Sequence, residues 1–206
     1  LGKLPLTELE RTSLFFDISE VHRRPVYVRV KRTVDVALAL LGLVALVPVT
    51  LVVAVVDPIA NRGPLLYRQR RVGRGGTEFT ILKFRTMREP AGPAGGGEGD
   101  GEWTGRDDAR VTPFGRLLRS THLDELPQVL NVLRGDLSIV GPRPEQPRYV
   151  EQLAATLPYY RMRHLVRPGL TGWAQVKYGY AGDERDALEK LQYEMYYLRN
   201  QSLSLD

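Results

Sequence analysis

The hydrophobic and polar positions divide the chain into one long apolar run and a series of short mixed segments. The run, Val36–Val56, holds twenty-one residues without a charge, and about twenty apolar residues are enough for a helix to cross a bilayer. Pro48 lies just past its middle. Proline inside a helix removes a hydrogen bond and clashes with the preceding turn, so we expect the helix to break or bend there.

Three structures are compatible with this run: a re-entrant helix–break–helix that enters one leaflet and returns, a spanning helix, and a buried core helix. Basic residues prefer the cytoplasmic side of a membrane segment, and both flanks are equally basic, which favours the re-entrant form. Two arms of about ten to twelve residues would reach about 15–18 Å each, short of the roughly 30 Å hydrocarbon core. A core helix that is apolar all round would need covering on every side. The basic flanks are Arg23, Arg24, Arg29, Lys31 and Arg32 before the run, and Arg62, Arg68, Arg70, Arg71 and Arg74 after it.

Shorter patterns predict the elements that follow. Two β-rich arms around Gly73–Gly76 predict a hairpin with glycine in its turn. The glycine-rich tract Ala91–Glu102 predicts a mobile loop. Thr112 and Pro113 are typical of a helix start, and this helix should end near Ser120.

The last third of the chain reads as further helices joined by turns. Helices are predicted from about Asp124 to Leu133 with a stop at Gly135, between Glu145 and Leu157, and from near Asp183 with Leu188, Leu191, Met195 and Leu198 on one face. The segment Arg167–Gly172, RPGLTG, places Pro-Gly in the central positions of a predicted type II turn.

Composition narrows the classes of partner. The chain of 206 residues is long enough for one domain, and its net charge of +5 favours an anionic partner. The aromatic residues are not interleaved with the basic clusters, and no zinc-finger or RNP pattern appears, so nucleic acid is disfavoured. The absence of cysteine excludes disulfides and thiolate chemistry.

Candidate chemistry centres on the adjacent carboxylates Asp124 and Glu125 at a predicted helix start. The N-terminus of a helix favours an ionised carboxylate or a bound phosphate. One carboxylate of such a pair can attack an electrophile while the other helps to hold Mg²⁺. Taken alone, the pair is more typical of helix capping.

Several cationic residues next to glycine, proline or short stiff segments strengthen the chemical interpretation. Grouped around a carboxylate–metal site, such cations would suit a diphosphate substrate. They are Lys83, Arg85, Arg119, Arg143 and Arg167. The three histidines, His22, His122 and His164, lack metal-ligand spacing, and no Rossmann, Walker A or GxSxG motif is present.

Ordered sequence blocks resemble one known family. They are KRTVD, GPLLYRQRRVG, FTILKFRTM, FGRLLRSTHLDELPQVLNVLRGDLSIVGPRPE, VRPGLTGWAQV and LRNQSLSLD. In this order and spacing, from Lys31 to Asp206, the chain resembles the bacterial sugar transferases, monotopic phosphoglycosyl transferases that load a sugar phosphate onto a polyprenol phosphate. The segment YGYAGDERDALEKLQYEMYYLRN is similar to the exopolysaccharide branch associated with exosortase systems.

The resemblance implies a reaction. Asp124 would attack the β-phosphate of a UDP-sugar, releasing UMP and leaving a phosphosugar on the enzyme, while Glu125 would help to bind Mg²⁺ with it. Polyprenol (undecaprenyl) phosphate would then take the sugar phosphate, in the first membrane step of exopolysaccharide or glycoconjugate assembly.

The resemblance also implies roles for other residues. Phosphate contacts are expected from Lys83, Arg85, Arg119 and Arg143, nucleotide contacts from Arg167, Thr171 and Gln175, and further contributions from Glu145 and Glu194. Two positions depart from the family. His122 replaces a small polar residue, and Glu194 replaces an aspartate. Glu194 lies at the edge of the last apolar helical stripe, where it could equally be amphipathic surface.

The implied architecture is an α+β, mostly helical fold in three parts. These are an N-terminal interfacial segment (1–33), a re-entrant membrane helix (34–60) and a cytoplasmic catalytic domain (61–206) with a mobile loop at 91–106. The expected location is the cytoplasmic face of the bacterial inner membrane. Expected partners are a UDP-sugar, polyprenol phosphate and membrane lipid, with a homodimer left open. Because Leu1–Val30 resembles neither a long membrane domain nor a very short start, the chain is expected to be a catalytic fragment. The rival functions are a catalytically silent membrane scaffold or lipid-binding protein, and a soluble Mg²⁺-dependent phosphohydrolase.

Overall fold

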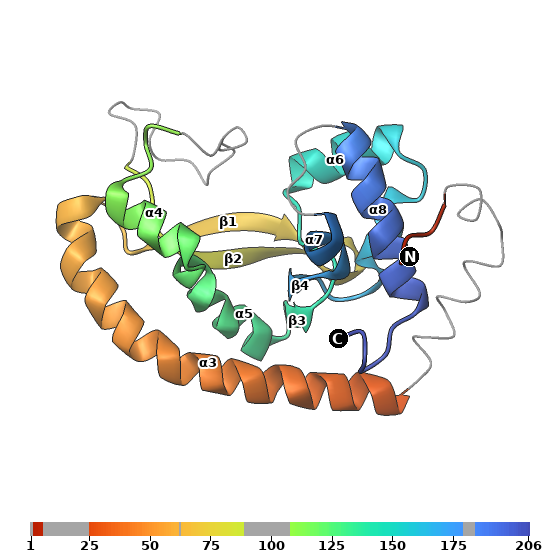
Figure 1. Cartoon of the computed structure of the whole chain (residues 1–206), viewed down its shortest axis with the longest axis horizontal. Helices are drawn as coiled ribbons and strands as arrows, with labels where there is room; N and C mark the ends of the chain where they lie inside the picture. Colours follow the sequence, from red (N-terminus) through yellow and green to blue (C-terminus); the bar gives the residue numbers. More distant parts are fainter. Residues whose placement is uncertain (1, 6–24, 62, 89–107, 179–183) are drawn as a thin grey trace.

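The computed structural model describes residues 2–5, 25–61, 63–88, 108–178 and 184–206. Most of the N-terminal interfacial segment and the glycine-rich loop predicted at 91–106 lie outside these residues. The described part is mostly helical and contains two two-stranded sheets. One long helix lies along one side of a domain built from the remaining elements (Figure 1). The predicted mostly helical fold with a small hairpin is confirmed.

The long helix α3, Pro25–Ala60, is a single element of 36 residues. The predicted break at Pro48 does not occur, and the helix continues through both Pro48 and Pro58. A proline removes one hydrogen bond and crowds one turn, but the neighbouring turns keep their bonds, so the helix can bend without ending. Figure 1 shows the resulting ribbon curving around the domain.

Helix α3 touches the domain along one narrow face. Its buried positions are Asp35, Ala39, Leu46, Val53 and Asp57. They repeat at intervals of four and seven residues, as expected for one stripe of a helix. Most other apolar side chains on the helix are exposed, including Leu41, Val44, Leu51, Val55 and Ile59. The reading as a buried core helix is therefore wrong. By length and hydropathy, α3 is the one helix among the described residues that could cross a membrane.

The predicted hairpin is present beside α3. Strands β1 (Leu66–Val72) and β2 (Glu78–Phe84) pair in antiparallel register. The turn between them contains η1, Arg74–Gly76. Gly75 and Gly76 have φ values of 69° and 80°, which glycine adopts without steric cost. The turn chemistry thus fixes where the hairpin reverses.

Helix α4, Pro113–Ser120, confirms the helix predicted from its capping residues. The Thr112 hydroxyl accepts a 2.9 Å hydrogen bond from the Gly115 N–H, which satisfies a free donor of the first turn. Gly115 also lets α4 approach the chain that follows β2, because a Cβ there would lie 1.9 Å from the carbonyl oxygen of Thr86.

The single helix predicted from Asp124 to Leu133 is two helical segments of different kind. A 3₁₀ segment, η2 (Leu123–Gln128), leads into α5 (Val129–Arg134). Pro127, which has no N–H to donate, lies in the 3₁₀ segment. The predicted stop is confirmed, because Gly135 caps α5 in the left-handed region with φ 95°.

The RPGLTG segment does not form the predicted type II turn. Its residues Gly169–Thr171 form strand β4, which pairs in parallel with β3, Ser138–Val140. A type II turn needs a positive φ at its third residue, and Gly169 has none. Non-local pairing has therefore decided this segment.

The C-terminal elements build a second core. Helix α8 (Glu184–Arg199) packs with α6 (Pro147–Thr156) and η3 (Tyr160–Leu165), and the short α7 (Trp173–Tyr178) contacts α8. The predicted apolar face of the last helix is confirmed, since Leu191, Met195 and Leu198 are fully buried. The first core lies between α3, β2, α4 and α5.

Candidate active site

The acidic pair lies on η2, directly after a strained residue. His122 has a φ of 57°, a left-handed conformation uncommon for a residue with a side chain. Its ring nitrogen Nδ1 lies 3.0 Å from the carbonyl oxygen of Arg119, and its own carbonyl accepts from the Glu125 N–H. This turn brings the chain from α4 into η2 and presents Asp124 and Glu125 to the hairpin. Such strain concentrates at functional sites.

Two cations hold the Glu125 carboxylate. Its Oε1 accepts a 2.7 Å hydrogen bond from Lys83 Nζ and a 3.0 Å bond from Arg143 Nη2. Burial by itself raises the pKa of Glu125, but the charges of Lys83 and Arg143 outweigh it and lower that pKa from 4.5 to about 2. Glu125 is therefore ionised at neutral pH and fixed in position.

The neighbouring Asp124 has a different environment. It is partly exposed, and its carboxylate has no side-chain hydrogen-bond or ion-pair partner among the described residues. Burial raises the pKa of Asp124, while the charges of Lys83 and Arg119 act in the opposite direction. One carboxylate is thus bound by cations, and the other remains available to a ligand.

Lys83 and Arg119 reach the pair from β2 and α4. Burial lowers the pKa of Lys83, although Glu125 beside it favours the charged form. The Arg119 side chain is oriented by a 2.9 Å hydrogen bond from its Nε to the Thr86 hydroxyl. Arg85 is held elsewhere, because its Nε donates to the carbonyl oxygen of Pro64 at 2.9 Å. Of the predicted phosphate ligands, Lys83, Arg119 and Arg143 therefore gather around the acidic pair.

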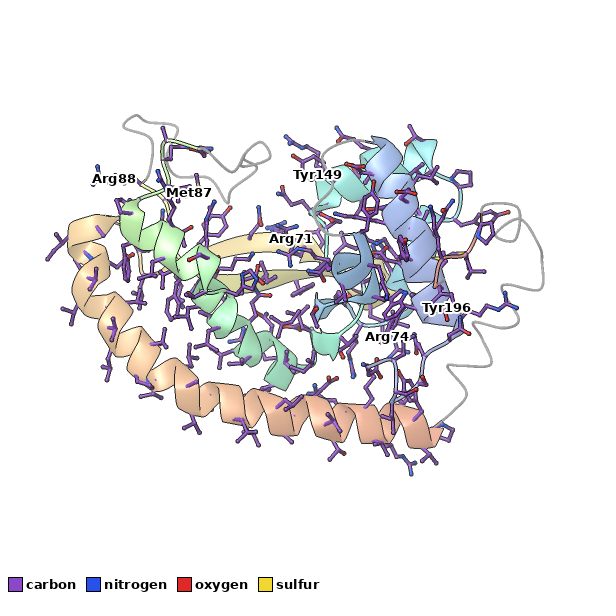
Figure 2. All side chains as sticks on the ribbon, in the orientation of Figure 1. Arg71, Arg74, Met87, Arg88, Tyr149 and Tyr196 are labelled. Atoms are coloured by element: carbon purple, nitrogen blue, oxygen red, sulfur yellow. The ribbon has the colours of Figure 1, made fainter. Side chains whose placement is uncertain are left out.

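Arg71 is a residue near the site that the sequence did not single out. From the end of β1 its Nη1 donates to the carbonyl oxygen of Pro144 at 3.0 Å and lies 3.5 Å from the Glu145 carboxylate (Figure 2). Burial lowers its pKa. A signal was available, because Arg71 and Gln69 share one face of an alternating strand. Glu145 thus pairs with Arg71 and helps to fix the loop that carries Arg143.

Glu194 is buried, with 5% of its surface exposed, so its alternative reading as amphipathic surface is wrong. Its carboxylate pairs with Arg163 through two hydrogen bonds of 2.6 and 2.9 Å. Arg163, which the sequence also did not single out, donates to the Tyr160 hydroxyl and, at 2.8 Å, to the carbonyl oxygen of Arg143. Among the described residues, Glu194 is therefore linked to the site through Arg163, which contacts the backbone of Arg143.

The three predicted nucleotide contacts lie on β4, on α7 and just before β4. Thr171 accepts a backbone hydrogen bond from Gly141, and Gln175 contributes a buried Oε1 without a partner in the described residues. The charged neighbours of Arg167 are Arg32, Arg74 and Asp35. The β3–β4 ladder pairs Thr171 with Val140, three residues before Arg143.

The acidic pair could hold a magnesium ion if phosphate and water completed the coordination shell. No group of three or more potential protein ligands occurs among the described residues. Mg²⁺ commonly uses one or two carboxylates and completes its shell with substrate phosphates and water. Asp124 offers a carboxylate without a side-chain partner in the described residues, and the contacts of Glu125 with Lys83 and Arg143 both involve the same oxygen, Oε1. The donor set therefore suits Mg²⁺ that arrives with a phosphate ligand.

Two carboxylates framed by three cations, on a domain packed against an exposed apolar helix, form a site whose charges suit a phosphate-containing ligand. A sequence profile described as bacterial sugar transferase matches residues 26–206. The chain belongs to this family.

Several relatives are similar over most of this chain. A UDP-N-acetylgalactosamine-undecaprenyl-phosphate N-acetylgalactosaminephosphotransferase of Aeromonas hydrophila is 41% identical over 88% of this chain and 42% of its own length. A UDP-glucose:undecaprenyl-phosphate glucose-1-phosphate transferase of Xanthomonas campestris is 38% identical over 100% of this chain and 41% of its own. The exopolysaccharide production protein ExoY of Sinorhizobium fredii is 36% identical over 95% and 88%, respectively. The chain thus spans about two fifths of the first two relatives.

Proposed function

We propose that this protein is a phosphoglycosyl transferase that moves a sugar 1-phosphate from a UDP-sugar to undecaprenyl phosphate through a phosphosugar–aspartyl intermediate. The asymmetry of the acidic pair carries the proposal. Lys83 and Arg143 bind Glu125 at 2.7 and 3.0 Å, whereas Asp124 keeps a carboxylate without a side-chain partner in the described residues. The activities for which the relatives are named supply the substrate class.

In the first step, an oxygen of Asp124 forms a bond to the phosphorus that carries the sugar. The bond from that phosphorus to the bridging oxygen breaks, and UMP leaves with the bridging oxygen. Negative charge grows on the departing phosphate. Lys83 and Arg143 each have donors beyond those used on Glu125, and with Arg119 they can stabilise this charge in a partly buried site.

In the second step, a phosphate oxygen of the polyprenyl carrier attacks the same phosphorus. The bond to Asp124 breaks, which restores the carboxylate and releases polyprenyl-diphosphate-sugar. Glu125, fixed by its two cations, holds the cationic side chains in place through both steps. Mg²⁺ bound by Asp124 and Glu125 would supply further neutralisation of the diphosphate.

The packing of α3 supports a monotopic arrangement. The buried stripe runs from Asp35 to Asp57, and twenty-two helical steps correspond to about 33 Å, roughly the thickness of the hydrocarbon core. An α3 that crossed upright would carry the attached domain into the bilayer, where buried charges and loop backbone are costly. We therefore propose that α3 enters the membrane from one side and returns as a bent but unbroken helix, with the domain on the cytoplasmic face of the inner membrane.

UMP release tests the reaction. The detergent-purified chain is assayed with a panel of UDP-sugars, Mg²⁺ and undecaprenyl phosphate, and intact mass is measured after the lipid is omitted. Wild type should release UMP and gain one sugar phosphate. Asp124→Asn should lose at least about a thousandfold in rate, as expected when a covalent nucleophile is removed. Glu151→Gln, an exposed charge change on α6, serves as the matched control. Wild-type turnover by Asp124→Asn would refute the assignment, and no UMP release from any UDP-sugar would favour a silent scaffold.

A further inference from the structure

Three arginines from distant parts of the sequence are charged neighbours near the first half of α3. Arg32 belongs to α3, Arg74 to the hairpin turn η1, and Arg167 precedes β4. Burial and the charges of Arg32 and Arg74 lower the pKa of Arg167. Like charges raise one another's energy, and the single carboxylate among them, Asp35, offsets only one of the three. Glu125 is held by two other cations, Lys83 and Arg143, so this arginine group is distinct from the acidic pair.

The acidic neighbour of the group is already engaged. Asp35 accepts a 2.8 Å hydrogen bond from the Ser138 hydroxyl on one oxygen and a 2.9 Å bond from the Ile139 N–H on the other. Arg32 is also fixed, because its guanidinium donates to the carbonyl oxygens of Val132 and Leu133 at 2.6 and 3.0 Å. These contacts fix the Arg32 side chain against the end of α5.

Arg74 and Arg167 bring the group to three positive charges, against which Asp35 supplies one negative charge. The N–H of Ser138 donates to the Pro168 carbonyl at 2.9 Å, which holds Arg167 next to the strand that binds Asp35. Segment η1 packs against η3, two residues before Arg167. Arg74 is exposed and is labelled in Figure 2. Within the described residues, no carboxylate pairs with Arg74 or Arg167.

The group lies where α3 changes from polar to apolar. Arg32 is four residues before Val36, the first residue of the uncharged run. Val28, Val30 and Val34 are exposed on the same stretch of helix. In a helix embedded from one side, this transition lies at the depth of the lipid headgroups, where cationic side chains meet phosphates.

We propose that Arg74 and Arg167, with Arg32 beside them, bind the phosphate group of a membrane lipid, so that Arg167 serves lipid binding in place of the nucleotide contact expected from the sequence. The planar guanidinium of Arg167 suits a paired contact with two phosphate oxygens. Arg74, on its glycine turn, closes over the outer side of the same phosphate. The inference rests on the proposed membrane placement of α3. It assigns the first half of the helix a fixed lipid neighbour that sets the orientation of the domain at the bilayer surface.

Native mass spectrometry in neutral detergent tests the site. The full chain is titrated with phosphatidic acid, phosphatidylglycerol or inorganic phosphate, and bound molecules are counted. Wild type should retain one anionic lipid. Arg167→Lys keeps the charge but loses the paired geometry, and should bind about fivefold more weakly, as for the loss of about one hydrogen bond. The exposed Arg74→Gln should also bind about fivefold more weakly. Arg148→Gln on α6, on the side of the domain away from α3 (Figure 1), should bind like wild type.

The outcomes separate a site from a general basic surface. Lipid retention by Arg167→Lys equal to that of wild type would overturn the proposal, because a diffuse charge effect does not distinguish Lys from Arg. Inorganic phosphate binding as tightly as the lipids would overturn the assignment to lipid. Flotation with neutral vesicles tests the membrane placement separately. Wild type that does not float refutes the placement, whereas flotation with an unaffected Arg167→Lys refutes only the phosphate site.

Discussion

Replacing Asp35 tests how α3 is attached to the domain. The side chain is 3% exposed and accepts hydrogen bonds from the Ser138 hydroxyl and the Ile139 N–H at 2.8 and 2.9 Å. Asp35→Ala would leave both donors without an acceptor in a buried place. Each orphaned donor costs about 1–3 kcal/mol. The variant no longer has the desolvation cost of burying the carboxylate, and this gain offsets part of the loss. We therefore expect the free energy of unfolding to fall by about 2–4 kcal/mol.

This loss is large against a total stability of about 5–15 kcal/mol for a typical domain. Chemical unfolding in neutral detergent, followed by circular dichroism, measures it. Asp35→Asn keeps one acceptor oxygen and should lose only about 1 kcal/mol. Val34→Ala, one residue away on the exposed face of the same helix, is the control and should change the free energy by less than about 0.5 kcal/mol. Equal midpoints for Asp35→Ala and Val34→Ala would refute the reasoning.

Two further predictions concern charged groups near the site. Glu194→Ala leaves Arg163 as a buried unpaired cation and should lower the free energy of unfolding by about 3–5 kcal/mol. The double variant Arg163→Met/Glu194→Leu should recover most of that loss. Chemical unfolding measures both free energies, and equal losses in the two variants would contradict the pairing. The pKa of Glu125 is lowered from 4.5 to about 2 on folding, so its contribution to stability is complete above about pH 4.5 and is lost as the pH falls towards 2. Free energies of unfolding measured across this window should fall by about 3 kcal/mol more for wild type than for Glu125→Gln, and parallel curves would disprove it.

Capping and turn residues predicted those elements whose ends are determined within a few positions of the sequence. The hairpin turn, the Thr112 cap and the Gly135 stop are each decided within a few residues, and each is confirmed. The helix α3 continues through Pro48 because the hydrogen bonds of the neighbouring turns outweigh the one bond lost at the proline. The proline taken alone could not predict this outcome. Strand β4 pairs with a segment about thirty residues away, and the type II turn predicted from Pro-Gly ignored that partner.

In the site, the sequence predicted which residue types take part but not which residues contact one another. Asp124, Glu125, Lys83 and Arg143 were selected by their chemistry, and the structure brings them together. Their contacts join positions 18 and 42 residues apart, which no single motif contains. Arg163 lies in a segment without a turn or motif, and its partner Glu194 is 31 residues away. A buried ion pair between distant segments leaves little trace in one sequence.

The attachment of α3 links the membrane to the chemistry. Two buried aspartates bracket the uncharged run: Asp35 binds β3, and Asp57 binds Asn61, which accepts a hydrogen bond from Thr112 at the start of α4. The helix between them packs against η2, which carries the acidic pair, and against α5, which follows η2 in the chain. If α3 is embedded as proposed, its depth sets the height of Asp124 above the bilayer. A lipid phosphate could then reach Asp124 without leaving the interface, because the domain cannot tilt away from a helix that is fixed to it at both ends.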